Sequence, residues 1–318
     1  MESSAYRRSW KTLLAFAIIY FVWGSTFLAI RIGVQEMPPL LMAAMRFTAA
    51  GLALYVWTIA RGEPSPTVRQ WTAASLLAIP LFVMDYGLLF WAEQRVPSGL
   101  AAVMLATIPA FMAITEIIFL RTQRFTLRLA FALLIGCAGV AVLVSPSLGL
   151  GRAPIDRMGA AALIVASLSW SIASTFTRKL PLPPSKAMSS GAQMLSGGVF
   201  LVIAAGAFGE FRDFHAAAVS RHAWLALIYL TVAGSIIAYT AYTWLIHHES
   251  PTLVGTYAYV NPVVAVLVGY FFGGEALGPR TIVGALCILV SVVVITTTPA
   301  KKAVAALAAE DASGATGS

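Results

Sequence analysis

The sequence predicts an all-α integral membrane protein of ten transmembrane helices, arranged as two inverted five-helix repeats. Three observations lead to this prediction. Of the 318 residues, 59% are hydrophobic and 11% are charged, whereas an ordinary soluble domain has roughly 25% charged residues. Apolar runs long enough to cross a bilayer recur between short polar connectors. Residues of the first half also recur, in the same order, in the second half.

Each predicted span offers about 20 mostly apolar residues, the length with which a helix crosses the roughly 30 Å hydrocarbon core. The spans are residues 12–34, 39–59, 70–91, 97–119, 126–145, 158–177, 186–208, 222–245, 251–273 and 280–298. A basic run at Arg7, Arg8 and Lys11 precedes the first span, as in a secretory signal. The apolar run that follows is too long for a signal peptide and lacks a convincing cleavage site. We therefore expect the first membrane helix there.

The basic residues predict the orientation. If the N-terminus is cytoplasmic, thirteen Lys and Arg residues lie on the inner side and seven on the outer side. Such an excess is typical of cytoplasmic connectors, so both termini are expected inside a cell (inner) membrane. The net charge of +8 is spread between hydrophobic runs and does not follow one polar face, so nucleic-acid binding is not expected.

The repeat is visible as residue pairs at nearly constant offsets. At an offset of 147 residues the pairs are Trp23 with Trp170, Arg31 with Arg178, Arg46 with Gln193 and Gly51 with Gly198. At an offset of 153 they are Tyr86 with Tyr239, Trp91 with Trp244 and Pro109 with Pro262. Because each repeat has an odd number of spans, the second must enter the membrane from the opposite side. Inverted repeats permit alternating access to a central site, although a channel or scaffold built by duplication is the alternative.

The predicted organisation has five parts. They are a cytoplasmic N-terminal segment (1–11), a first five-helix repeat (12–145), an external linker (146–157), a second five-helix repeat (158–298) and a disordered cytoplasmic tail (299–318).

Several short motifs occur in a characteristic order along the chain. They are Trp23-Gly24-Ser25-Thr26-Phe27, Arg46-Phe47, Val96-Pro97-Ser98-Gly99, Ser169-Trp170, and Tyr257-Ala258-Tyr259-Val260-Asn261-Pro262 with Gly274-Glu275. These motifs resemble those of the EamA-like transporter family of the drug/metabolite transporter superfamily, and the resemblance extends over nearly the whole chain. The resemblance implies a secondary carrier, usually an exporter of metabolites, amino acids or drugs. It also implies that spans one to four and six to nine surround the cavity.

Two departures from the family pattern affect the expected mechanism. Thr122-Gln123 stands where a Gly-Glu-like pair is expected after the fourth span, and Asp85 stands where close relatives are expected to have a neutral amide. A relative's coupling mechanism therefore does not transfer directly to this chain.

Two ionisable residues lie deep in predicted spans, where a charge is costly and usually faces a cavity. Arg46 and Asp85 each lie six or seven residues from the outer end of their span, so both are roughly 10 Å deep. We expect Asp85 to be a proton-coupling site and Arg46 to be its partner or the anchor of a substrate carboxylate. A fixed ion pair between the helices is the alternative. Glu116 lies near the cytoplasmic end of its span, and its side chain is expected to reach the interface.

The predicted substrate cavity combines aromatic surfaces with few polar groups, as a site for a small organic ligand requires. Its residues are Trp23, Arg46, Asp85, Tyr86, Trp170, Gln193, Tyr239, Tyr257 and Asn261. Packing between helices is the alternative role for the individual aromatic residues. Pro109 and Pro262 fall within spans at equivalent positions and predict helix kinks, either as hinges or as static features.

The sequence contains no phosphate-binding loop for ATP, no zinc-protease helix and no convincing nucleophile with a base. We expect neither an enzyme nor a bound cofactor or metal. The predicted function is secondary active transport of a small molecule across the lipid bilayer, with export implied by the resemblance alone; a membrane channel or facilitator is the alternative. Proton coupling, a non-transporting scaffold, and a monomer or a homodimer all remain open.

Overall fold

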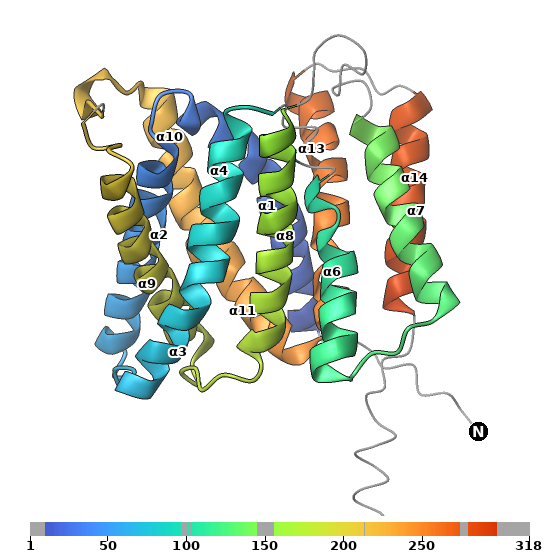
Figure 1. Ribbon diagram of the computed structural model, residues 1–318, viewed down its shortest axis with the longest axis horizontal. Coiled ribbons are helices and arrows are strands. Elements are labelled where there is room, and N and C mark those ends of the chain that lie inside the picture. Colours follow the sequence, from blue (N-terminus) through green and yellow to red (C-terminus); the bar gives the residue numbers. More distant parts are fainter. Residues whose placement is uncertain are drawn as a thin grey trace, which may run out of the picture.

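The computed structural model describes residues 10–96, 101, 104–144, 156–212, 214–273 and 279–297. The segment before residue 10, most of the predicted linker, the tail, and the motif residues Pro97-Ser98-Gly99 and Gly274-Glu275 lie outside this part of the chain. Throughout the described ranges the regular structure is helical, and the helices are arranged side by side as one bundle (Figure 1).

The helices follow the predicted spans closely. The first half forms α1 (Trp10–Val34), α2 (Pro39–Ala60), α3 (Val68–Ala78), η1 (Ile79–Gly87), α4 (Leu88–Glu93), α6 (Ile108–Thr115), η2 (Glu116–Leu120) and α7 (Leu127–Val144). The second half forms α8 (Arg157–Thr177), α9 (Lys186–Ala207), η3 (Ala216–Ala218), α10 (Arg221–Tyr229), η4 (Leu230–Ile237), α11 (Ala238–His248), α12 (Pro251–Val254), α13 (Tyr257–Gly273) and α14 (Pro279–Thr296). The segments η1 and η4 are π-helical and each continues directly into the α-helices on both sides.

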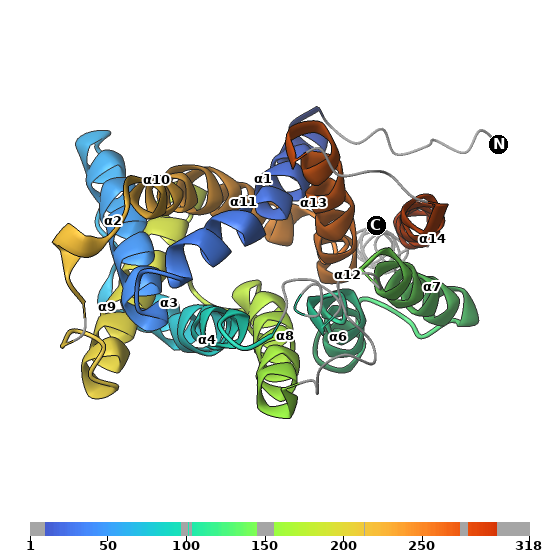
Figure 2. The same cartoon turned by 90° about the horizontal axis from the view of Figure 1, so that it is seen from above.

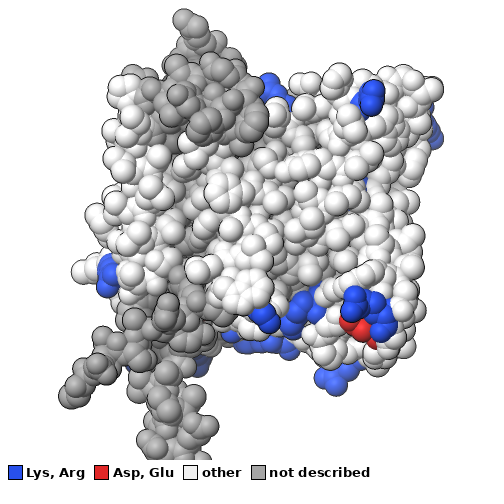
Figure 3. Space-filling view, turned by 180° about the vertical axis from the view of Figure 1, so that it is seen from behind, with Lys and Arg blue, Asp and Glu red and all other residues white. Residues whose placement is uncertain are grey.

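The described chain is an all-helical membrane protein. Six of its helical runs are long and apolar enough to cross a membrane: Trp10–Val34, Pro39–Ala60, Val68–Glu93, Arg157–Thr177, Lys186–Ala207 and Arg221–His248. Large apolar side chains such as those of Phe21, Leu28 and Leu134 are exposed on the outside of the bundle, where lipid would cover them. On the face drawn in Figure 3, the charged atoms gather mainly near the two ends of the bundle.

Two helix pairs flank the bundle. The pair α2 and α9 packs along its length at one side, and the pair α7 and α14 lies together at the other (Figure 2). Glycine permits the close approach of α2 to α9. A Cβ atom on Gly51 would lie 2.4 Å from the backbone nitrogen of Leu195, and one on Gly198 would lie 2.3 Å from Oγ1 of Thr48.

Carboxylates link the two halves at the end of the bundle where α1 finishes, which we call the Val34 end; the opposite end is the Trp10 end. Glu36 accepts hydrogen bonds from the backbone nitrogen and Oγ of Ser220, at 2.6 and 2.7 Å. Ser220 is the N-cap of α10. Glu210, which follows α9, accepts from the backbone nitrogens of Leu40 and Leu41 at the start of α2. Both carboxylates thus satisfy free N–H groups at helix N-termini.

The contact of Glu36 predicts a pH dependence. The hydrogen bonds from Ser220 hold the pKa of Glu36 below its ordinary value. The contact therefore stabilises the fold above the ordinary glutamate pKa and is lost as the pH falls through the lowered folded-state pKa. We expect hydrogen-exchange protection of the segment containing Ser220 to be constant near neutral pH and to fall in acid. In Glu36→Gln, protection should be low at every pH; equal profiles for the two proteins would contradict the assignment.

Glu116 differs from the prediction, because its side chain does not reach the interface. It is completely buried, and one carboxylate oxygen accepts a hydrogen bond from Thr122 Oγ1 at 2.8 Å. The other oxygen accepts from the backbone nitrogen and Oγ1 of Thr252, at 3.1 and 2.7 Å. Thr252 lies in the first turn of α12, whose free N–H groups attract a carboxylate. The side chain therefore turns inward and ties η2 to α12 at the Trp10 end.

Replacing Glu116 by Gln should destabilise the protein by about 1 to 2 kcal/mol, because one charged acceptor of three hydrogen bonds becomes a neutral amide. The unfolding midpoint in detergent measures the effect. Glu63→Gln is the matched control, because Glu63 lies in the connector after α2 and its side chain makes no hydrogen bond to another described residue. Equal midpoints for the two variants would show that the link to α12 contributes nothing.

The two prolines occupy different positions in their helices. Pro109 lies in the first turn of α6, where a missing N–H breaks no helical hydrogen bond, and directly after a turn at Ala106 and Thr107, so its role in a kink stays a prediction. Pro262 lies inside α13, and its role as a hinge stays a prediction.

Candidate functional site

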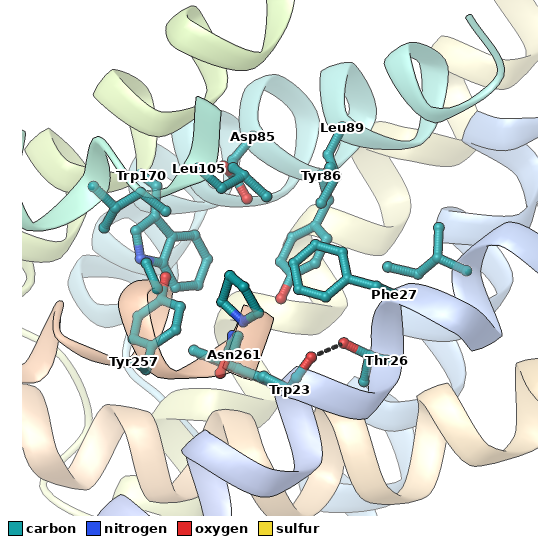
Figure 4. A pocket seen from close by; sticks show the side chains of 14 residues that line it. Trp23, Thr26, Phe27, Asp85, Tyr86, Leu89, Leu105, Trp170, Tyr257 and Asn261 are labelled. Atoms are coloured by element: carbon teal, nitrogen blue, oxygen red, sulfur yellow. Dashed lines mark hydrogen bonds between the residues drawn. The ribbon is translucent and has the colours of Figure 1, made fainter. Parts of the chain in front are cut away.

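A cavity lies about halfway along α1, between α1, η1, α4, α6, α8 and α13 (Figure 4). The residues that line it are Trp23, Thr26, Phe27, Ile30, Asp85, Tyr86, Leu89, Leu105, Ile108, Trp170, Tyr257, Ala258, Asn261 and Pro262. Its volume is about 50 Å³, which holds a few water molecules. Side chains or helices must therefore move before an organic molecule can bind.

An aromatic cluster forms the wall of this cavity. The ring of Trp23 lies 4.8 Å from that of Tyr257 and 5.8 Å from that of Trp170, both in edge-to-face arrangements. Tyr86 also meets Trp170 edge-on at 5.8 Å, and Tyr242 lies 5.0 Å from Trp170. Rings at these separations attract one another and present an apolar surface. Tyr242 was missed by the sequence analysis, although it follows Tyr239 by three residues and so shares a helix face with it.

Hydrogen bonds fix the cluster to neighbouring helices. Trp23 Nε1 donates to the carbonyl oxygen of Gly234 in η4 at 2.9 Å. The Tyr239 hydroxyl donates to Oε1 of Gln193 at 3.0 Å, and the amide nitrogen of Gln193 donates to the carbonyl oxygen of Ser189. Tyr239 and Gln193 therefore lie behind the cluster and do not line the cavity.

Asp85 is the acidic group of the cavity. It lies in η1, is 5% exposed, and its carboxylate points into the cavity from the side opposite Trp23 and Asn261 (Figure 4). Its Oδ1 atom has no hydrogen-bond partner within the described ranges. A buried carboxylate without a donor is costly, and either a proton or a cationic ligand would reduce the cost.

Arg46 occupies a separate position beside the cluster. It is 1% exposed, and its Nε donates to Oγ of Ser235 at 2.8 Å. Its guanidinium carbon lies 5.0 Å from the ring centre of Tyr86 and 4.7 Å from that of Phe47. Arg46 does not line the cavity, and no salt bridge joins it to Asp85. Similar depth in two helices did not place the two charges side by side, because depth does not determine the direction in which each side chain points.

Comparison with known proteins identifies the family. The sequence pattern of the EamA-like transporter family matches residues 10–145 and, a second time, residues 157–297. This chain belongs to the EamA-like transporter family. The family is part of the drug/metabolite transporter superfamily, so the protein is a membrane transporter by descent.

Relatives within the family match most of the chain. The inner membrane transporter YedA of Escherichia coli K12 is 38% identical over 280 residues, which cover 87% of this chain and 88% of YedA. Protein PecM of Dickeya dadantii is 25% identical over 277 residues, covering 86% of this chain and 88% of PecM. A solved crystal structure has the same fold, with a TM-score of 0.74 and 22% identity over 91% of this chain and 98% of that chain.

Proposed function

We propose that this protein is a secondary active transporter that exports small metabolites, amino acids or amphipathic drugs by alternating access, coupled to protons. The observation that carries the proposal is the Asp85 carboxyl, whose buried Oδ1 has no hydrogen-bond partner among the described residues, in a central cavity with aromatic walls. The rings supply apolar contacts for an organic molecule, and Asn261 supplies a polar one. Binding of a proton and binding of a positively charged substrate group at Asp85 would then exclude each other.

Arg46 is a second candidate for substrate contact. Its Nη1 atom lacks a hydrogen-bond partner in the described chain, and its guanidinium stacks near Tyr86, which lines the cavity. We propose that Arg46 holds a substrate carboxylate when the cavity enlarges toward α2, because a guanidinium binds a carboxylate through two parallel hydrogen bonds.

We also propose that ten spans form two inverted halves, residues 12–145 and 158–298. Three observations support this arrangement. The family pattern matches twice, once in each half. The π-helical segments η1 and η4 occupy equivalent positions in the two halves. The contact of Gly51 with Leu195 is mirrored by that of Gly198 with Thr48, with both partners shifted by the same 147 residues.

The directions of the helices also support inversion. The start of α8 lies at the Val34 end, because a Cβ atom on Gly159 would contact Val96, just after α4. The first helix of the other half, α1, starts at the opposite end (Figure 1). Because basic residues are in excess on the side of the Trp10 end, we propose that this end is cytoplasmic. We also propose that the membrane is an inner membrane, as for YedA.

The test is transport by the purified protein in liposomes. Counterflow is measured for a panel of labelled amino acids and amphipathic metabolites, with and without a pH gradient. Saturable counterflow of a panel member supports a carrier, and stimulation by the gradient supports proton coupling. Flux that neither saturates nor shows counterflow would contradict the carrier and favour a channel.

A further inference from the structure

A second cavity lies at the Val34 end of the bundle. Its volume is about 430 Å³, and five of its seven lining residues are polar or charged. The end of α1 contributes Arg31 and Gln35, and the end of α4 contributes Glu93 with the following Gln94 and Arg95. The two cavities lie in succession along α1 and α4, because Ile30 and Leu89 line the central cavity, and Arg31 and Glu93, further along the same two helices, line this one.

Glu93 is chemically unusual in this cavity. Both of its carboxylate oxygens are buried, and neither has a hydrogen-bond partner in the part of the chain that the structure describes. Asp85 is the other carboxylic acid of the described chain with an unpartnered buried oxygen. Buried polar groups are normally hydrogen-bonded, so both carboxyls are suited to hold a proton or to accept hydrogen bonds from water in their cavities.

The two carboxyls lie on one helical run. Asp85, Leu89 and Glu93 follow at intervals of four residues, so successive members project from nearly the same side of the helix. Eight residues correspond to about 12 Å along the axis, which is too far for direct transfer of a proton and short enough for a chain of a few water molecules. Leu89, which lines the central cavity, lies midway between the two carboxyls along this run.

We propose that Glu93 is the proton-exchange site through which Asp85 is connected to the Val34 side of the membrane. The inference rests on the proposed proton coupling at Asp85. The Glu93 carboxyl gives its proton to the first water molecule of a short chain, and the last water molecule of the chain gives a proton to the Asp85 carboxylate. Glu93 is left as a carboxylate and regains a proton from water in its own cavity. Carboxyl groups arranged along a helix commonly serve as proton relays in membrane proteins.

The charges around Glu93 fit such a role. Arg31 on α1 interacts favourably with the Glu93 carboxylate, and Arg95 follows on its own chain segment. On α8, which packs against α4, Asp156 and Arg157 stand at the helix start. The remaining neighbours of α4 carry few charges: α2 contains Arg46, and η1 contains Asp85. Arg31 therefore gives the Glu93 carboxylate a positively charged neighbour in the same cavity.

The test follows the protonation of Asp85 in the reconstituted full chain and needs no substrate. A proton jump is generated with a light-sensitive caged acid, and the infrared carbonyl band of protonated Asp85, identified by its absence in Asp85→Asn, is recorded over time. In Glu93→Gln the rise of this band should be about tenfold slower than in the unmodified protein. Glu93→Asp should restore the rate in part, and Glu63→Gln should have the normal rate.

The outcomes separate this inference from the proposed function. If the Asp85 band is present and rises at the same rate in Glu93→Gln, the role of Glu93 is overturned and the coupling at Asp85 stands. If Asp85 shows no band at any pH, both are overturned. Size-exclusion chromatography shows whether each variant is folded. If Glu93→Gln is misfolded, the rate at which the Asp85 band rises is compared between Glu93→Asp and Glu63→Gln. The rise should be slower in Glu93→Asp, and equal rates would overturn the role of Glu93.

Discussion

Asp85→Asn should reduce proton-driven transport to the level of protein-free liposomes. Asparagine has nearly the same shape as aspartate but cannot bind and release a proton, so a pH gradient can no longer drive the cycle. The unfolding temperature should not fall, because the substitution removes the cost of a buried carboxylate that lacks a hydrogen-bond donor on Oδ1. Transport is measured in liposomes with the compound that shows counterflow, across a range of pH gradients.

A conservative acid provides the control. Asp85→Glu keeps a titratable carboxyl in the same cavity and should retain part of the proton-driven rate. If Asp85→Asn kept the pH dependence of the unmodified protein, Asp85 would not be the coupling site. The aromatic cluster would then remain as a binding surface, and the proton would have to be bound elsewhere.

Gly198→Ala should cost about 3 kcal/mol of stability, the upper part of the range for overpacking a well-packed core. The new Cβ atom would lie 2.3 Å from Thr48 Oγ1 and 2.6 Å from the Thr48 backbone nitrogen. The side chain can rotate away, but the backbone nitrogen cannot, so α2 and α9 must separate along their extensive contact. The free energy of unfolding in detergent measures the cost.

Gly206→Ala is the matched control, because it lies on the same helix and a Cβ atom there meets nothing closer than Phe211 at 3.5 Å. This variant should be neutral or slightly stabilising, since alanine favours a helix more than glycine does. A stability loss of similar size in both variants would mean that the α2–α9 contact is not what makes Gly198 necessary.

The sequence alone determined where the helices lie along the chain. A helix that crosses a bilayer needs an apolar run of nearly constant length, and six of the predicted spans are helical runs long and apolar enough to cross a membrane, while the full set of ten stays a prediction. The sequence also pairs Gly51 with Gly198 at the constant offset, and at both of these glycines α2 and α9 lie too close for an added Cβ atom. Trp23, Tyr86, Trp170 and Tyr257, which the sequence analysis named, line the central cavity, and their part in binding a substrate stays a prediction.

Only the tertiary structure decided which side chains meet. Arg46 and Asp85 share a depth, yet Arg46 turns to Ser235 and Asp85 faces the cavity. Glu116 lies near a span end, where the sequence predicts that its side chain reaches the interface, yet its carboxyl is buried. A hydrophobic run defines position along the membrane normal but leaves the rotation of each helix open. That rotation is set by packing against helices about 100 or more residues away, and so it is absent from any local pattern.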